Sequence, residues 1–274
     1  MASMFDLRDK VVLVTGASRG VGRALAVALG ALGANVSCAA RATDERRLRL
    51  PGTIDETARQ VNAAGGQALA VPTDLSRTAD VTSMIRATVE HFGGLDVLVN
   101  NAAVTFNGDL DIDPKRYDLV MDINVRAPMI ATREARAALA AAGEGRILNV
   151  SSFAALSYYP TMMAYGMSKA AIEHLTVSCA AQLESDSIAV NCLRIDTAVA
   201  TEGFMMNAPD GDHASWTPPE VAAAGLIWML QQPTTYTGQV ESMVGLARRT
   251  GCMPSVAARP DRPALGWPVH QPAS

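Results

Sequence analysis

Neither a metal site nor a disulfide framework is indicated by the cysteine and histidine content of this 274-residue chain. Its four cysteines are scattered, without Cys-x-x-Cys spacing, and its four histidines form no cluster of ligands. We therefore expect reduced thiols, no bound metal and a cytoplasmic location.

The chain also lacks an excess of basic charge and a long apolar run. It carries 23 Lys and Arg against 27 Asp and Glu, so no basic surface for nucleic acid is expected. No stretch approaches the roughly 20 apolar residues of a membrane span, and residues 1–6 do not begin a charged segment followed by an apolar core. Nucleic-acid binding, membrane insertion and export are all disfavoured.

What the sequence does contain is an alternation of short apolar strands and helices. The expected strands are 10–14, 34–39, 67–71, 95–99, 145–151, 187–193 and 239–244. The expected helices are 20–32, 54–64, 78–92, 114–141, 162–184 and 218–231. This pattern predicts a single α/β domain over 1–250, with a Rossmann-type, doubly wound parallel sheet of about seven strands. All strands then end at one edge, where a ligand binds.

The first strand runs into a glycine-rich turn, Thr15-Gly16-Ala17-Ser18-Arg19-Gly20-Val21-Gly22, and a helical pattern follows. The N–H groups and the positive dipole end of such a helix attract anions, and glycine lets the backbone approach a diphosphate closely. An ordinary turn is the alternative. The position between a strand and a helix favours dinucleotide binding.

Tyr165 and Lys169 are four residues apart and therefore share one helix face. An unperturbed tyrosine titrates near pH ~10, and a fixed cation beside it favours the phenolate. The pair is thus a candidate general acid/base, although the same spacing also occurs by chance on helix surfaces.

Further motifs occur in chain order. Asn100-Asn101-Ala102-Ala103 follows the strand 95–99, Asn124 lies in the next helix, and Ser152 precedes Tyr165 by thirteen residues. With the Gly-x-x-x-Gly-x-Gly turn, they resemble the short-chain dehydrogenase/reductase family over about residues 6–245. The long connection that ends in Leu50-Pro51-Gly52-Thr53-Ile54 resembles the hydroxysteroid dehydrogenase-like branch of that family.

The resemblance implies an Asn-Ser-Tyr-Lys active site. Tyr165 would protonate a carbonyl oxygen while nicotinamide delivers hydride, Ser152 would hold that oxygen, and Lys169 would lower the pKa of Tyr165 and bind the nicotinamide ribose. Asn124 would hold a water that links Lys169 to solvent. The cofactor-binding residues implied are Gly16, Ser18, Arg19, Gly20, Val21, Gly22, Arg41, Asp74, Leu75, Asn101, Ala102, Tyr165, Lys169 and Thr201.

The end of the second strand bears on cofactor choice. An NAD-selective enzyme commonly has a carboxylate at the position of Ala40, whereas Arg19 and Arg41 stand where NADP-preferring relatives carry basic residues. We expect NADP(H) rather than NAD(H). The alternative is that both arginines are solvated and that Asp44 and Glu45 neutralise Arg41.

One departure from the family pattern follows the strand 187–193. Ile195-Asp196 replaces the usual Pro-Gly. Asp196 either places a negative charge near the nicotinamide or caps the start of the next helix. Thr201 is the first choice for the nicotinamide carboxamide contact, and Thr197 is the second.

The substrate pocket is expected to be apolar, which favours a hydrophobic ketone, aldehyde or secondary alcohol. Its candidate residues are Phe106, Phe153, Tyr159, Met163 and Phe204, with a lid over about 197–217. Such a cluster could also be plain core. The expected activity is NADP(H)-dependent hydride transfer, and the alternatives are a non-catalytic NADP(H)-binding or sensing protein and an epimerase or dehydratase, for whose extended substrate domain the chain leaves no room.

The segment 251–274 is rich in proline and has no periodicity. It is either disordered or docked on a partner subunit, and Trp267 favours docking. The resemblance implies a homodimer or homotetramer assembled through the helices 114–141 and 162–184.

Overall fold

The computed structural model describes residues 4–259 of the chain. Seven parallel strands form one sheet in the order β3-β2-β1-β4-β5-β6-β7. The strands are β1 (Val11–Thr15), β2 (Asn35–Ala40), β3 (Gln67–Pro72), β4 (Val97–Asn100), β5 (Arg146–Ser152), β6 (Ala189–Ile195) and β7 (Val240–Ser242). The predicted α/β class, strand number and parallel pairing are confirmed.

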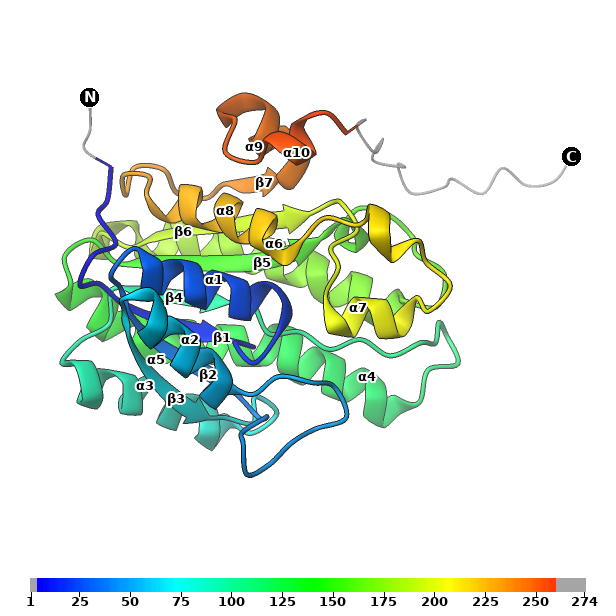
Figure 1. Ribbon diagram of the computed structural model, residues 1–274, viewed down its shortest axis with the longest axis horizontal. Coiled ribbons are helices and arrows are strands. Elements are labelled where there is room, and N and C mark those ends of the chain that lie inside the picture. Colours follow the sequence, from blue (N-terminus) through cyan, green and yellow to red (C-terminus); the bar gives the residue numbers. More distant parts are fainter. Residues whose placement is uncertain (1–3, 260–274) are drawn as a thin grey trace, which may run out of the picture.

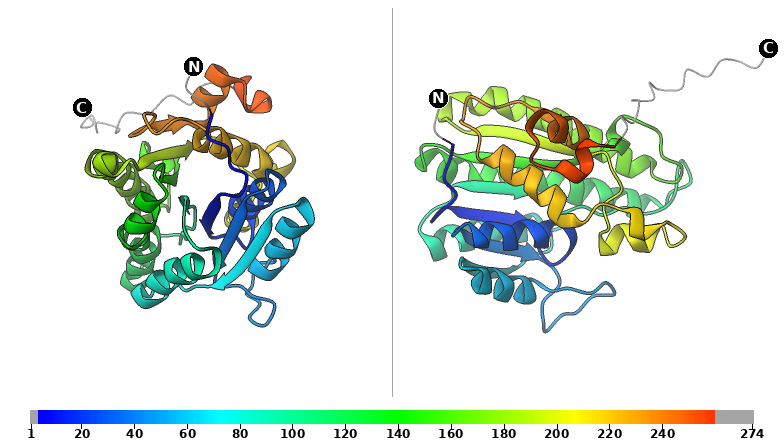
Figure 2. Two further views of the ribbon diagram at one scale, coloured as in Figure 1. Left: turned by 90° about the vertical axis from the view of Figure 1, so that its left-hand side faces the viewer. Right: turned by 45° about the horizontal axis from the view of Figure 1, so that its top comes forward.

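Helices cover both faces of this sheet (Figures 1 and 2). The principal helices are α1 (Gly20–Ala31), α2 (Ile54–Ala64), α3 (Thr78–Phe92), α4 (Pro114–Met121), α5 (Ala127–Ala141), α6 (Met163–Leu183) and α8 (Pro219–Leu230). Three shorter helices are α7 (Glu202–Asn207), α9 (Met243–Thr250) and α10 (Pro254–Ala257).

Two apolar cores explain why the strands are almost continuously hydrophobic. Val12 and Val14 of β1 pack with α1, α2 and α8, whereas Val11 and Leu13 of the same strand pack with α3 and α5. Alternate residues of one strand therefore face opposite layers, and both faces exclude water.

The strand order reverses between β1 and β4, because β2 and β3 lie on one side of β1 and β4 to β7 lie on the other. Loops after these neighbouring strands leave the sheet in opposite directions, which opens a crevice at their carboxyl ends. This topology places the glycine turn after β1 beside Asn101, which follows β4.

The predicted helix 114–141 is interrupted. A π-helical turn over Asp122–Arg126 separates α4 from α5. Pro128 has no N–H to donate to the carbonyl of Asn124 four residues earlier, so the α-helical hydrogen-bond ladder cannot run through this point.

The C-terminal part differs from the prediction more strongly. The expected strand 239–244 shortens to β7, because Ser242 caps α9 by accepting a hydrogen bond from the Gly245 N–H. Residues beyond 250 continue the fold, since Met253 and Val256 are buried in the core beside α8 and α9. The predicted docking of Trp267 lies outside the described residues.

Candidate active site

A cleft of about 590 Å³ opens at the carboxyl ends of the central strands. It brings together residues that are distant in the sequence. The predicted site residues that line it are Gly16, Ser18, Arg19, Gly20, Val21, Gly22, Arg41, Leu75, Asn101, Ala102, Phe106, Ser152, Phe153, Tyr159, Tyr165, Lys169, Thr201 and Phe204.

Three predicted site residues lie elsewhere. Asp74 faces an adjoining polar hollow that also contains Arg41 and Arg46. Met163 begins α6, and its neighbour Met162, the residue before the helix, lines the cleft instead. Asn124 is buried behind the cleft wall in the π-helical turn.

The glycine turn has the backbone geometry that its sequence requires. Gly16 has a φ of 69°, a backbone conformation that glycine adopts readily and that residues with a Cβ atom rarely adopt. A Cβ on Gly22 would collide with the Gly16 carbonyl oxygen and with the Asn101 amide. Asn101 closes this contact by donating from Nδ2 to the Thr15 carbonyl oxygen at 2.8 Å. The first turn of α1 is thereby fixed against the end of β4.

Ser152, Tyr165 and Lys169 meet on the floor of the cleft. Ser152 is the last residue of β5, and the other two lie one turn apart on α6, which packs against that strand. Ser152 forms a side-chain hydrogen bond with the Tyr165 phenol. The Lys169 Nζ lies 5.5 Å from the centre of the Tyr165 ring and donates to the Val150 carbonyl oxygen at 2.8 Å.

The electrostatics of this trio correct one expectation. Burial raises the pKa of Tyr165 to about 12, although the hydrogen bond with Ser152 acts in the opposite direction. Burial also lowers the pKa of Lys169 to about 8, while Cys192 and Glu173 oppose that change. The predicted lowering of the tyrosine pKa by Lys169 is therefore absent, because loss of hydration dominates for both groups.

Asn124 connects the floor to the neighbouring loop. Its Oδ1 accepts from the Val104 N–H at 2.9 Å, and its Nδ2 donates to the Val104 carbonyl at 2.9 Å and to the Ser168 hydroxyl at 3.0 Å. The side chain is thus used for protein contacts. Both N–H donors of the amide are engaged within the protein, so a water here could only donate to an oxygen atom of Asn124.

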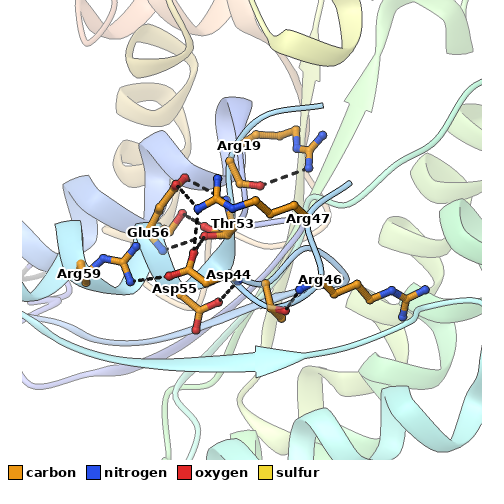
Figure 3. A network of polar contacts seen from close by, with 11 residues as sticks. Arg19, Asp44, Arg46, Arg47, Thr53, Asp55, Glu56 and Arg59 are labelled. Carbon is orange, nitrogen blue, oxygen red and sulfur yellow. Dashed lines mark hydrogen bonds and ion pairs between the residues drawn. The ribbon is translucent and has the colours of Figure 1, made fainter. Parts of the chain in front are cut away.

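The loop between β2 and α2 carries a network of charged side chains at one end of the cleft (Figure 3). Asp44 accepts from Arg59 at 2.9 Å and lies 3.6 Å from Arg47, so its carboxylate is engaged by these two cations. Within residues 4–259, Arg41 forms no ion pair with Asp44 or Glu45. The alternative in which these acids neutralise Arg41 is therefore not what the structure contains.

Asp74 and Arg19 flank the same end. Burial by itself would raise the pKa of Asp74, but hydrogen bonds from the Ser76 hydroxyl and N–H lower it below its ordinary value. Burial lowers the pKa of Arg19, and Glu202 opposes this. Arg19 also donates to the Gly52 carbonyl at 3.4 Å, which ties the glycine turn to the long loop.

Asp196 caps a helix, but not the one that follows it in the sequence. Its Oδ1 accepts from the Val244 N–H at 3.1 Å, and its Oδ2 accepts a short hydrogen bond from the Ser242 hydroxyl. Both partners belong to the start of α9. The residue in place of glycine after β6 therefore anchors the C-terminal helix, while it also lines the cleft.

The expected lid contains a helix that sequence periodicity did not reveal, because α7 is only six residues long. Thr201 caps it by accepting from the Phe204 N–H at 3.2 Å, so the hydroxyl predicted to meet the carboxamide has a structural partner. Phe204 stacks on Trp216 with ring centres 4.6 Å apart. Arg259 donates to the Ser215 carbonyl at 3.1 Å and joins the C-terminal segment to the lid.

Glu202 is a site residue that the sequence analysis missed. Its Oε2 accepts from the Gly20 N–H at 2.9 Å, and its Oε1 accepts from Arg23 at 2.7 Å. No local pattern announces this contact, because 182 residues separate Glu202 from Gly20. The local sequence around Glu202 indicates only an acidic residue after Thr201, the N-cap of α7.

Two absences hold for residues 4–259. No helix there combines the length and apolarity needed to cross a membrane. No group of three or more His, Cys, Asp or Glu side chains is placed to hold a metal ion.

The sequence is similar to curated relatives named hydroxysteroid dehydrogenase-like protein 2. The protein of that name from Danio rerio is 33% identical over 231 residues, which are 83% of this chain and 55% of the relative. The chain thus spans about half the length of the curated relatives it matches.

Several solved structures share the fold. A putative dehydrogenase from Xanthomonas campestris has a TM-score of 0.82 at 32% identity, covering 91% of this chain and 92% of that one. A short chain dehydrogenase from Burkholderia cenocepacia J2315, in complex with NADP, has a TM-score of 0.76 at 29% identity, covering 87% and 97%. An NADH-dependent reductase responsible for alginate metabolism has a TM-score of 0.73 at 27% identity, covering 86% and 96%.

The family model for short chain dehydrogenase matches residues 10–208, which include the glycine turn, Ser152, Tyr165 and Lys169. This match extends over most of the sheet and both walls of the cleft. The chain belongs to the short chain dehydrogenase family.

Proposed function

We propose that this protein is an NADP(H)-dependent oxidoreductase that reduces a hydrophobic ketone or aldehyde, or oxidises a secondary alcohol. The observation that carries the proposal is the meeting of Ser152, Tyr165 and Lys169 in one cleft with the glycine turn. These residues provide a proton donor, a partner for an oxygen atom and a cation beside a dinucleotide-binding turn.

The bound nicotinamide supplies or accepts the hydride. In reduction, Tyr165 donates its phenolic proton to the carbonyl oxygen, and the Ser152 hydroxyl holds that oxygen in reach. A pKa near 12 keeps Tyr165 protonated at neutral pH and therefore ready to act as the acid. In oxidation the same phenol must first lose its proton, and the hydrogen bond with Ser152 favours that loss.

Lys169 is placed to bind a ribose hydroxyl. Its Nζ uses one donor on Val150, which leaves two for that contact. Asn124 positions Ser168 and the Val104 loop, so we assign it a positioning role.

The preference for NADP(H) rests on two arginines. Arg19 and Arg41 both line the cleft, and Ala40 provides no carboxylate for a ribose 2′-hydroxyl. Guanidinium groups bind phosphate oxygens well, which suits the 2′-phosphate of NADP(H). Relatives of similar fold include an NADP complex and an NADH-dependent reductase, so the choice must be measured for this chain.

The substrate class is inferred from the apolar part of the lining. Phe106, Phe153, Met162, Phe204 and Met206 line the same cleft as Tyr165. Such a surface gains free energy by excluding water from an apolar substrate.

The test is the loss of NADPH absorbance with a panel of hydrophobic ketones and aldehydes, run beside the same panel with NADH. Turnover that is faster with NADPH and abolished in Tyr165→Phe supports the proposal. Tight NADPH binding without turnover of any substrate would favour a sensing protein instead. Full activity in Tyr165→Phe would refute the acid/base role.

We also propose assembly through α5 and α6. Met129 on α5 and Met167 and Val177 on α6 expose 46%, 47% and 43% of their surface, and a second copy of the chain would cover these apolar side chains. Sedimentation of the purified protein would show a dimer or tetramer, and Met167→Glu would shift it towards the monomer.

A further inference from the structure

The N-terminus of α1 is held by an acid from the other side of the cleft. Glu202 is the first residue of α7, in the lid, and it accepts a hydrogen bond from the Gly20 N–H, the first of α1. Its second oxygen accepts from Arg23, also in the first turn of α1. With 17% of its side chain exposed, Glu202 is largely removed from water in this position.

The start of α1 has no anion of its own. Arg19 is the N-cap residue and makes no side-chain capping hydrogen bond, and the first turn of α1 contains no acidic residue. Arg19 and Arg23 instead add two cations to the positive end of the helix dipole. The free N–H groups of this turn therefore require an acceptor, and Glu202 supplies it from 182 residues away.

The diphosphate of a dinucleotide would bind to the same N–H groups in the first turn of α1. The diphosphate is expected at this turn because the glycines and the helix N-terminus form the anion site of the fold. The Gly20 N–H cannot serve both acceptors, and a carboxylate and a diphosphate repel each other at this distance.

Resting on the proposed function, we infer that Glu202 is an internal competitor of the cofactor diphosphate, and that its displacement couples cofactor binding to the position of the lid. While Glu202 is bound, α7 lies against the glycine turn. Thr201 carries two atoms close to Gly20, so that a Cβ at Gly20 would lie 3.1 Å from one of them.

Displacement of Glu202 must move side chains that face the substrate. Phe204, Met206 and Asn207 follow Glu202 within the same short helix and line the cleft. Because Phe204 stacks on Trp216, Trp216 near the end of the lid must move as well or lose this contact. Cofactor binding is therefore expected to change the positions of Phe204, Met206 and Asn207 in the cleft.

The experiment is a fluorescence titration of NADPH with the full-length chain, wild type against Glu202→Ala. Removal of an acid from a ligand site is expected to tighten binding, with a Kd lower by about fivefold to tenfold, because the charge that competes with the diphosphate is gone. Glu202→Gln, which keeps the shape but loses the charge, should show an intermediate change and decides the matter if Glu202→Ala does not fold.

Glu220→Ala is the matched control. Glu220 is also an acid in the first turn of a helix, α8, and it is exposed. Its replacement should leave the NADPH Kd unchanged, which excludes a general effect of net charge.

Two results would overturn the inference, and only the second would also overturn the proposed function. If wild type binds NADPH and Glu202→Ala binds it equally or more weakly, Glu202 does not compete, and the proposed function stands. If neither wild type nor either Glu202 variant binds NADPH or NADH, both the role of Glu202 and the proposed function fail.

Discussion

The floor and the lid of the cleft are held in different ways. Ser152, Tyr165 and Lys169 lie on β5 and α6, which belong to the sheet and its covering layer, and Lys169 is buried while Tyr165 is partly buried. The lid over 197–217 has only one short α-helix and a 3-10 turn, and most of its side chains are partly exposed. In the proposed function, the proton chemistry thus lies on elements of the sheet and its covering layer, and the selection of ligands falls to a segment that a few polar contacts hold.

The largest effect should come from the floor. Tyr165→Phe removes the proton donor and should lower kcat by about 10²- to 10⁴-fold without changing the fold or the NADPH Kd. Steady-state kinetics and a cofactor titration measure the two quantities. Tyr158→Phe is the control, because Tyr158 is exposed at the rim and its hydroxyl donates to Asp109; a similar loss there would show that the floor is not special.

Because Lys169 is buried, the free energy of unfolding should depend on pH. The Lys169 pKa is about 8 in the folded protein and 10.5 as an ordinary lysine, so between these values the unfolded chain binds more protons. The free energy of unfolding should therefore rise with pH from about 8 to 9; above pH 9 the raised pKa values of Cys38 and Cys192 act in the opposite direction, and above pH 10 so does that of Tyr165.

Urea unfolding at a series of pH values measures this rise. Lys169→Met should abolish it, and Lys115→Met, at an exposed position, should retain it. A wild-type stability that does not rise between pH 8 and 9 relative to that of Lys169→Met would contradict the burial of a charged Lys169.

A substitution of Asp196 tests whether its hydrogen bonds to the start of α9 stabilise the protein. Asp196→Ala removes the acceptor for Val244 N–H and Ser242, which should cost about 1–2 kcal/mol of unfolding free energy. Thermal and urea unfolding provide the measurement. Asp210→Ala, an exposed acid in the lid, should be close to neutral; equal losses for both variants would mean that the cap adds nothing.

The smallest effect is expected at the adenosine end. Arg41→Ala should raise the NADPH Kd by about tenfold, because one charge-assisted contact to phosphate is lost, and should leave the NADH Kd unchanged. Arg49→Ala, an exposed arginine of the same loop, is the control. Equal weakening of both cofactors by Arg41→Ala would show that Arg41 does not recognise the 2′-phosphate.

The sequence predicted what depends on local pattern. Strand and helix ranges in the first two thirds of the chain agree with the structure within a few residues, because the buried strands are continuously apolar and α2 has a capping box formed by Thr53 and Glu56. The spacing between Ser152 and Tyr165 also placed the floor residues in one cleft.

The parts that the sequence did not predict depend on tertiary contacts. Asp196 meets Ser242 across 46 residues, and Glu202 meets Gly20 across 182. The pKa of Tyr165 was misjudged for the same reason, since burial depends on the whole fold and not on the neighbouring lysine. Short helices such as α7 carry too few residues for periodicity to be recognised.

The burial of Met253 limits how far the C-terminal end of the chain can be shortened or replaced. Its sulfur lies against Gly225 of α8, where even an added methyl group would meet it at 2.7 Å. Removal of the chain after Thr250 would uncover this groove and leave apolar surface of α8 open to solvent. A chimaera or fusion that exchanges C-terminal modules should therefore join its new segment after Arg259, so that Met253 and Val256 remain in the core.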